Sequence, residues 1–236
     1  MTSIESILED IFNKKVKSFI IHLEQSYDRK ILIDKLIKNT NSNIEIIPAI
    51  DGNLYTHVPH KCPYETNCYL CVKFNNNHYR NNGEIGCLLS HLKIWKRIVD
   101  ENIDYALIYE DDCCFINSLE NLKIDLDNIK DDLLKCDGFL LGALGYRNSS
   151  IYINSSICKV NQFDGTHALL ISKYMASKLI EFHEQEQLKG FLHPADGHFY
   201  STIKEYNLNV YGFINYFKFF RQNNGPSYIA NTIRTE

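Results

Sequence analysis

The chain has 236 residues, 44% of them hydrophobic, which is enough for one sizeable core and too few for two independent ones. Its net charge of −4 comes from 29 acidic and 25 basic residues that are mixed along the chain, so no basic stripe is available for a nucleic-acid backbone. The acidic N-terminus and the lack of a long apolar run predict a cytoplasmic protein without a signal peptide or membrane span.

The first 50 residues alternate between helical and extended patterns. An amphipathic pattern over 3–13 predicts a short helix, and the apolar run in 16–23 predicts the first buried strand. A second helix is expected over 28–38, with Ser26 as its N-cap, followed by a short strand over 44–47. The order of these elements is typical of an α/β protein.

Residues 53–82 have no clear period and are expected to form a variable loop rich in Cys and His. Its potential metal ligands are His57, His60, Cys62, Cys68, Cys71 and His78. These could form a structural Zn²⁺ site, but a second Cys-x-x-Cys pair is missing and the spacing is not a standard one. Reduced loop cysteines are the alternative, since nothing here indicates a secreted disulfide scaffold.

The second half of the chain continues the alternation. A helix is expected over 84–100, followed at once by a strand over 105–109 whose unbroken apolar run suits burial on both faces. Further helices are expected over 119–134 and 172–183, and further strands over 138–141 and 167–171. We therefore predict one α/β domain spanning residues 1–236, with a central, mostly parallel sheet.

Three consecutive carboxylates, Glu110, Asp111 and Asp112, follow the expected strand over 105–109. The carboxyl ends of strands are where open α/β sheets bind ligands, and clustered carboxylates suit Mg²⁺ or Mn²⁺. Because side chains alternate along a strand, Glu110 and Asp112 are expected to share a face and one metal ion. No Gly-rich phosphate loop is present, which favours a diphosphate held through the cation; a solvated acidic turn is the alternative.

The central block resembles the signature of family 25 glycosyltransferases, which include lipopolysaccharide and collagen galactosyltransferases. The resemblance rests on Gly-Glu-Ile-Gly-Cys-Leu-Leu-Ser-His-Leu at 83–92, Trp-Lys at 95–96 and Tyr-Ala-Leu-Ile-Tyr-Glu-Asp-Asp at 105–112. Shorter matches lie at 19–29, 49–52, 165–168, 194–196 and 222–227.

The resemblance implies a GT-A fold, Mn²⁺, and transfer of galactose or glucose from a UDP-sugar with inversion at the anomeric carbon. The acceptor would be a hydroxyl of a glycan or of a collagen-like protein. Asp112, helped by Glu110, would hold the metal that neutralises the departing UDP. Asp111 would hold the groups that surround the metal, or it would contact the sugar.

Inverting transfer also needs a general base beside the acceptor hydroxyl, and Asp196 is the candidate. Pro194 precedes an expected helix start, which places this carboxylate at a helix N-terminus. That position stabilises the anion and is expected to lower its basicity, which counts against Asp196 as the base. The alternative is a plain capping aspartate.

Further residues are candidates for the donor site. Ser90 and His91 match the family's Ser-His pair, although a histidine on an apolar helix can equally be structural. Arg29 and Asp51 follow strand ends and suit donor contacts; a surface charge and a turn residue are their alternatives.

The remaining candidates come from the matches downstream of the central block. Gly165, Thr166 and Ser227 are expected near the donor. Gln222 takes a place where a histidine often completes metal coordination in related enzymes. This departure leaves open a non-catalytic member that binds nucleotide-sugar or glycan. A second hypothesis, a zinc-stabilised interaction module, rests on the Cys- and His-rich loop and takes the three acids as merely solvated.

Overall fold

The computed structural model describes residues 2–52, 59–60, 71–74, 77–80, 82–146, 151–189 and 193–223. Of the predicted zinc ligands, His57, Cys62 and Cys68 lie outside the described residues, as does the donor-site candidate Ser227. His60, Cys71 and His78 lie in short strands of which only the backbone is described.

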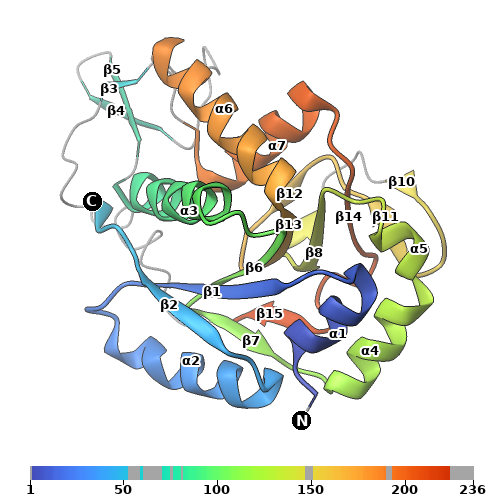
Figure 1. Ribbon diagram of the computed structural model, residues 1–236. Coiled ribbons are helices and arrows are strands. Elements are labelled where there is room, and N and C mark those ends of the chain that lie inside the picture. Colours follow the sequence, from blue (N-terminus) through green and yellow to red (C-terminus); the bar gives the residue numbers. More distant parts are fainter. Residues whose placement is uncertain are drawn as a thin grey trace.

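An eight-stranded sheet forms the centre of the molecule (Figure 1). Its order is β10 (Ile151–Tyr152), β11 (Ile157–Lys159), β14 (Val210–Phe213), β8 (Gly138–Gly142), β13 (Ala168–Ser172), β6 (Tyr105–Glu110), β1 (Val16–His22) and β2 (Ile44–Pro48). Strands β2, β1 and β6 are parallel, and so are β8 and β14, whereas β13 lies antiparallel between β6 and β8. The expected α/β fold with a mostly parallel sheet is confirmed.

Helices cover both faces of this sheet (Figure 1). One face carries α1 (Ile4–Phe12), α2 (Tyr27–Thr40), α4 (Leu119–Asn128) and α5 (Lys130–Leu133); the other carries α3 (Asn82–Asp100), α6 (Lys173–Lys189) and α7 (Ala195–Tyr206). A hydrophobic core lies on each face of the sheet. Strand β6 contributes Leu107 and Tyr109 to the core on the α1 side, and Ala106 and Ile108 to the core on the α3 side. Its unbroken apolar run therefore has the two-sided burial that the sequence predicted.

Three small sheets complete the described fold. They pair β12 (Phe163–Asp164) with β9 (Gly145–Tyr146), β15 (Phe220–Gln222) with β7 (Cys113–Phe115), and β5 (Asn77–Arg80) with both β3 (Pro59–His60) and β4 (Cys71–Phe74). The last of these lies in the region expected to be a variable loop, which thus contains short strands. The β15–β7 pairing matters for the site, because its register sets Gln222 opposite Cys113, directly after the three carboxylates.

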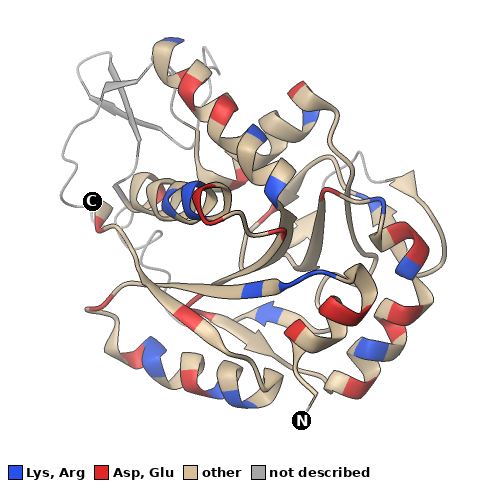
Figure 2. Cartoon of the chain, viewed as in Figure 1, with Lys and Arg blue, Asp and Glu red and all other residues tan. Residues whose placement is uncertain are grey.

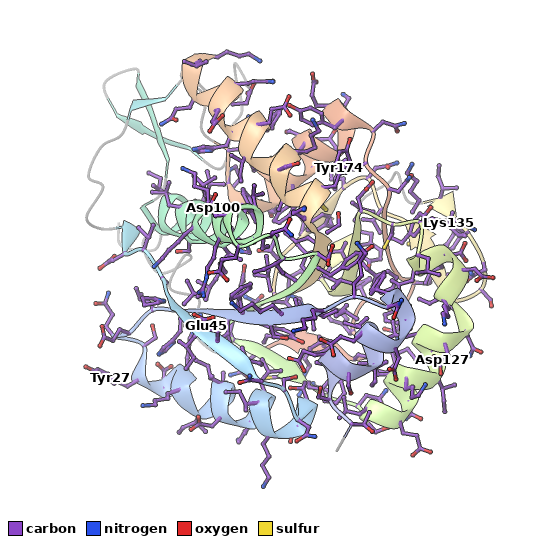
Figure 3. The ribbon with its side chains drawn as sticks, in the orientation of Figure 1. Tyr27, Glu45, Asp100, Asp127, Lys135 and Tyr174 are labelled. Atoms are coloured by element: carbon purple, nitrogen blue, oxygen red, sulfur yellow. The ribbon has the colours of Figure 1, made fainter. Side chains whose placement is uncertain are left out.

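Charged residues of both signs are spread along the helices, and they also occur on the edge strand β2 (Figure 2). Glu45 on β2, labelled in Figure 3, pairs with Arg97 on α3 and lies 3.6 Å from Lys17 on β1. Charges along an edge strand hinder its pairing with another chain. Among the described helices, none is both long enough and apolar enough to cross a membrane.

Candidate active site

The three carboxylates lie where β6 ends and the chain turns into β7, next to the end of β1. Each points to a different set of partners. The contacts of each carboxylate determine what the site can hold.

Asp111 is an anchor between β1, α2 and the acidic turn. Its Oδ1 accepts a hydrogen bond from Arg29, and its Oδ2 accepts one of 3.3 Å from the backbone N–H of Leu23. The same Oδ2 lies 3.0 Å from Nδ1 of His22. The side chain of Asp111 is only 7% exposed, and the cost of burying its charge is offset mainly by the Arg29 cation.

Asp112 is also buried, but one of its oxygens lacks a partner. Oδ2 accepts a hydrogen bond of 2.9 Å from Nε2 of Gln222 and lies 3.3 Å from Nη2 of Arg29. Within the described part of the chain, Oδ1 is buried without any hydrogen bond. Burial and the charge of Glu110 raise the pKa of Asp112 from 3.8 to about 6. A buried carboxylate oxygen of this kind is suited to a cation.

Glu110 points towards α3 and the start of β13. Its Oε1 accepts a hydrogen bond from the hydroxyl of Thr166, lies 3.3 Å from Nε2 of His91 and lies 3.9 Å from Sγ of Cys87. Burial opposes ionisation, but the hydrogen bonds with His91 and Thr166 bring the pKa of Glu110 below its ordinary value. Glu110 and Asp112 thus have different partners, and their sharing of one metal ion stays a prediction.

Ser90 and His91 are both fully buried on α3. The Ser90 hydroxyl accepts a hydrogen bond of 2.8 Å from the backbone N–H of Ile50 and donates one of 2.6 Å to the carbonyl of Gly86. The imidazole of His91 lies against the ring of Trp95, with 5.9 Å between centroids. Ser90 therefore joins α3 to the segment after β2, whereas His91 reaches the acidic turn.

Asp196 lies in the first turn of α7, after the N-cap Pro194, as the sequence predicted. Its Oδ1 accepts a hydrogen bond of 2.7 Å from the backbone N–H of Gly197. Burial, together with the charges of Asp164 and Glu110, nevertheless raises the pKa of Asp196 above its ordinary value. The expected lowering by the helix N-terminus is thus outweighed, because desolvation exceeds the stabilisation from the backbone amides.

The other predicted donor-site residues lie around the same sheet edge. Asp51 accepts a hydrogen bond of 3.0 Å from the side-chain amide of Gln25. Gly165 has a φ of 78°, a conformation that favours glycine, and it turns the chain so that Thr166 meets Glu110. The role of each in donor binding stays a prediction.

Two neighbours of the acids, His22 and Cys87, are not among the residues that the sequence predicted for the site. His22 is the last residue of β1, and the register of β1 and β6 pairs Ile21 with Glu110, so strand-end position could have indicated it. Cys87 lies within the block that resembles the family signature. Its spacing of four residues from His91 already places both on one face of the helix in the sequence, although that spacing alone assigns Cys87 no role.

The fold is an α/β sheet whose strand ends carry a buried acidic turn, and one carboxylate oxygen of that turn is unpartnered among the described residues. The family model described as "Glycosyltransferase family 25 (LPS biosynthesis protein)" matches residues 15–196, more than half of the chain. The chain therefore belongs to glycosyltransferase family 25, and the resemblance seen in the sequence is confirmed.

Individual relatives match over shorter stretches. The chain is 27% identical over 115 residues to procollagen galactosyltransferase 2 of Homo sapiens, a match covering 47% of this chain and 18% of the relative. It is 32% identical over 111 residues to the lipooligosaccharide biosynthesis protein lex-1 of Haemophilus influenzae, covering 42% of this chain and 36% of that protein. The matches thus span less than half of either relative.

Among solved structures, a glycosyltransferase involved in the glycosylation of the major capsid of PBCV-1 is 9% identical, with a TM-score of 0.45, covering 90% of this chain and 94% of that one. A197 from STIV is 16% identical, with a TM-score of 0.42, covering 84% of this chain and 80% of that one. Because both scores are below 0.5, the family assignment rests on the family model.

Proposed function

We propose that this protein is a metal-dependent glycosyltransferase that moves galactose or glucose from a UDP-sugar to a hydroxyl of a glycan or protein acceptor, with inversion. Membership of family 25 supports transfer of a sugar. The relatives named for procollagen galactosyl transfer and lipooligosaccharide biosynthesis support an acceptor of either kind.

The observation that carries the proposal is the buried Oδ1 of Asp112, which has no partner within the described part of the chain. A buried carboxylate that Arg29 and Gln222 satisfy on only one oxygen fits a hard divalent cation such as Mn²⁺ or Mg²⁺ on the other. When bound, that ion would neutralise charge on the departing UDP. Arg29, held by Asp111, keeps a second positive charge beside it.

Asp196 is proposed as the general base. Its raised pKa makes it a better proton acceptor than an ordinary aspartate. The charge of Glu110 contributes to the raised pKa of Asp196, so the two carboxylates are near enough to interact. Asp196 would remove the proton from the acceptor hydroxyl as that oxygen attacks the anomeric carbon.

The test is release of UDP from a panel of UDP-sugars, with Mn²⁺ or with EDTA, comparing the wild type with Asp112→Asn and Asp196→Asn. Release from one donor that needs Mn²⁺ is expected, and both variants should lose it. Asp196→Asn should keep UDP binding, because its proposed role is confined to the acceptor proton. The exposed Asp131, changed to Asn, is the matched control.

The outcomes separate the alternatives. Binding of UDP without turnover on any donor and acceptor would favour a non-catalytic member of the family. Absence of both binding and turnover would favour the interaction-module hypothesis.

A further inference from the structure

Cys87, His91 and Glu110 bring three metal-binding atoms together between α3 and the end of β6. Cys87 Sγ lies 3.9 Å from Oε1 of Glu110, and Nε2 of His91 lies 3.3 Å from the same oxygen. In the described part of the chain, these three side chains form a group whose ligand atoms all lie within 4.8 Å of one another. Zinc bonds of about 2.0–2.3 Å place tetrahedral ligands roughly 3–4 Å apart, so small side-chain shifts would complete the site.

The scaffold holds these atoms in place. Cys87 and His91 are four residues apart on α3, and His91 is fully buried against Trp95 and Phe199. Glu110 is the last residue of the central strand β6. Ligands on a helix and a central strand are positioned more accurately than ligands on loops.

A fourth group lies at the same point. The hydroxyl of Thr166 is 3.3 Å from Nε2 of His91 and donates to Oε1 of Glu110. It therefore borders the position that a water molecule or the hydroxyl itself would take as fourth ligand of a tetrahedral ion.

The donor set differs in kind from the one at Asp112. A thiol and an imidazole with a single carboxylate favour Zn²⁺ and similar transition-metal ions, whereas oxygen atoms alone favour Mg²⁺ or Mn²⁺. Asp112 and its partner Gln222 offer oxygen and amide groups only.

We infer that Cys87, His91 and Glu110 form a binding site for Zn²⁺ or a chemically similar transition-metal ion, separate from the cation site proposed at Asp112. Binding replaces the thiol proton of Cys87, which is released to solvent, and the imidazole coordinates through Nε2. The site stands on the geometry of these side chains and does not depend on sugar transfer.

Cobalt is the probe that tests this site, because a thiolate bound to Co²⁺ absorbs in the near ultraviolet and an oxygen-only site does not. Metal-free protein is titrated with Co²⁺ in the wild type, Cys87→Ser and Cys114→Ser. We expect the thiolate band in the wild type and in Cys114→Ser, and loss of the band in Cys87→Ser. Cys114 is the matched control, since its thiol lies beside the carbonyl of Asp112 and outside the group. Zn²⁺ should displace the cobalt and abolish the band, and Mg²⁺ should not.

An equal band in Cys87→Ser would assign the signal to other thiols and overturn the inference, as would no band in the wild type. If circular dichroism shows that Cys87→Ser does not fold, Glu110→Gln decides. In this variant, the cobalt affinity measured from the thiolate band should fall by at least about tenfold. Unchanged affinity would overturn the site. The Asp112 cation site contributes no sulfur, so its failure would not imitate either result.

Discussion

The side-chain amide of Gln222 donates a hydrogen bond of 2.9 Å to Oδ2 of Asp112, joining residues 110 positions apart in the chain. The pairing of β15 with β7 makes this contact possible. It occupies one oxygen of the buried carboxylate and leaves the other without a partner in the described part of the chain. Both the stability of the metal-free protein and its affinity for a cation should therefore respond to changes at these two residues.

Replacing Asp112 with Asn should stabilise the metal-free protein at neutral pH. The pKa of Asp112 in the folded state is about 6, above the ordinary 3.8, so the folded protein binds more protons than the unfolded chain between these values. The contribution of Asp112 to stability therefore falls as the pH rises through that window. We expect Asp112→Asn to gain about 1–3 kcal/mol at pH 7. The gain should shrink towards pH 3.8.

Urea unfolding of wild type and variant across this pH range, in EDTA, measures the effect. Asp131→Asn, at an exposed position, should change little. Mn²⁺ should stabilise the wild type and have little effect on Asp112→Asn, because the ion binds the folded carboxylate. A variant less stable than the wild type at pH 7 in EDTA would contradict the prediction.

Gln222→His should strengthen Mn²⁺ binding, and Gln222→Ala should weaken it. An imidazole offers a better metal ligand than an amide, whereas alanine removes the group that orients Asp112. We expect changes of about tenfold in affinity in each direction. Calorimetric titration with Mn²⁺ checks this, with the exposed neighbour Arg221→Ala as control. Equal affinities in all four proteins would exclude Gln222 from the metal site.

Thr166→Val should destabilise the protein more than Thr202→Val. The hydroxyl of Thr166 donates to the carboxylate of Glu110, whereas that of Thr202 donates to the backbone carbonyl of His198, and both threonines are buried. Hydrogen bonds to charged groups contribute about 1.5–3 kcal/mol and neutral ones about 0.5–1.5. The free energies of unfolding of the two variants at pH 7 give the comparison. A larger loss for Thr202→Val would mean that Glu110 is not held through Thr166.

Gly86→Ala should destabilise the contact between α3 and the segment after β2. A Cβ at Gly86 would lie 2.5 Å from the carbonyl oxygen of Ile50 and 2.8 Å from the backbone nitrogen of Gly52, so the helix would have to move away. Overpacking of this kind costs about 1–3 kcal/mol. Gly145→Ala, where a Cβ would have nothing within 4 Å, is the control and should be near neutral. Thermal unfolding of both variants tests this. Equal melting temperatures would show that the segment after β2 moves away from α3 without a cost in stability.

The sequence by itself determined the main elements and the position of the acids. The apolar periodicity of α3 and the unbroken run of β6 identified a buried helix and a strand covered on both faces, because burial on one or two sides leaves a direct trace in residue order. The three carboxylates at the end of β6 followed from that strand, and the block from Gly83 to Asp112 indicated the family by residue order alone.

The tertiary structure alone decided how the carboxylates are partnered. Side-chain alternation predicted one face for Glu110 and Asp112, yet Glu110 meets His91 and Thr166 while Asp112 meets Gln222 and Arg29. The chain leaves the strand after Glu110, so the alternation no longer applies. The partners come from segments up to 110 residues away, and their approach depends on strand pairing and helix packing, which residue order does not encode locally. The same holds for the raised pKa of Asp196, since desolvation depends on what the folded chain places around it.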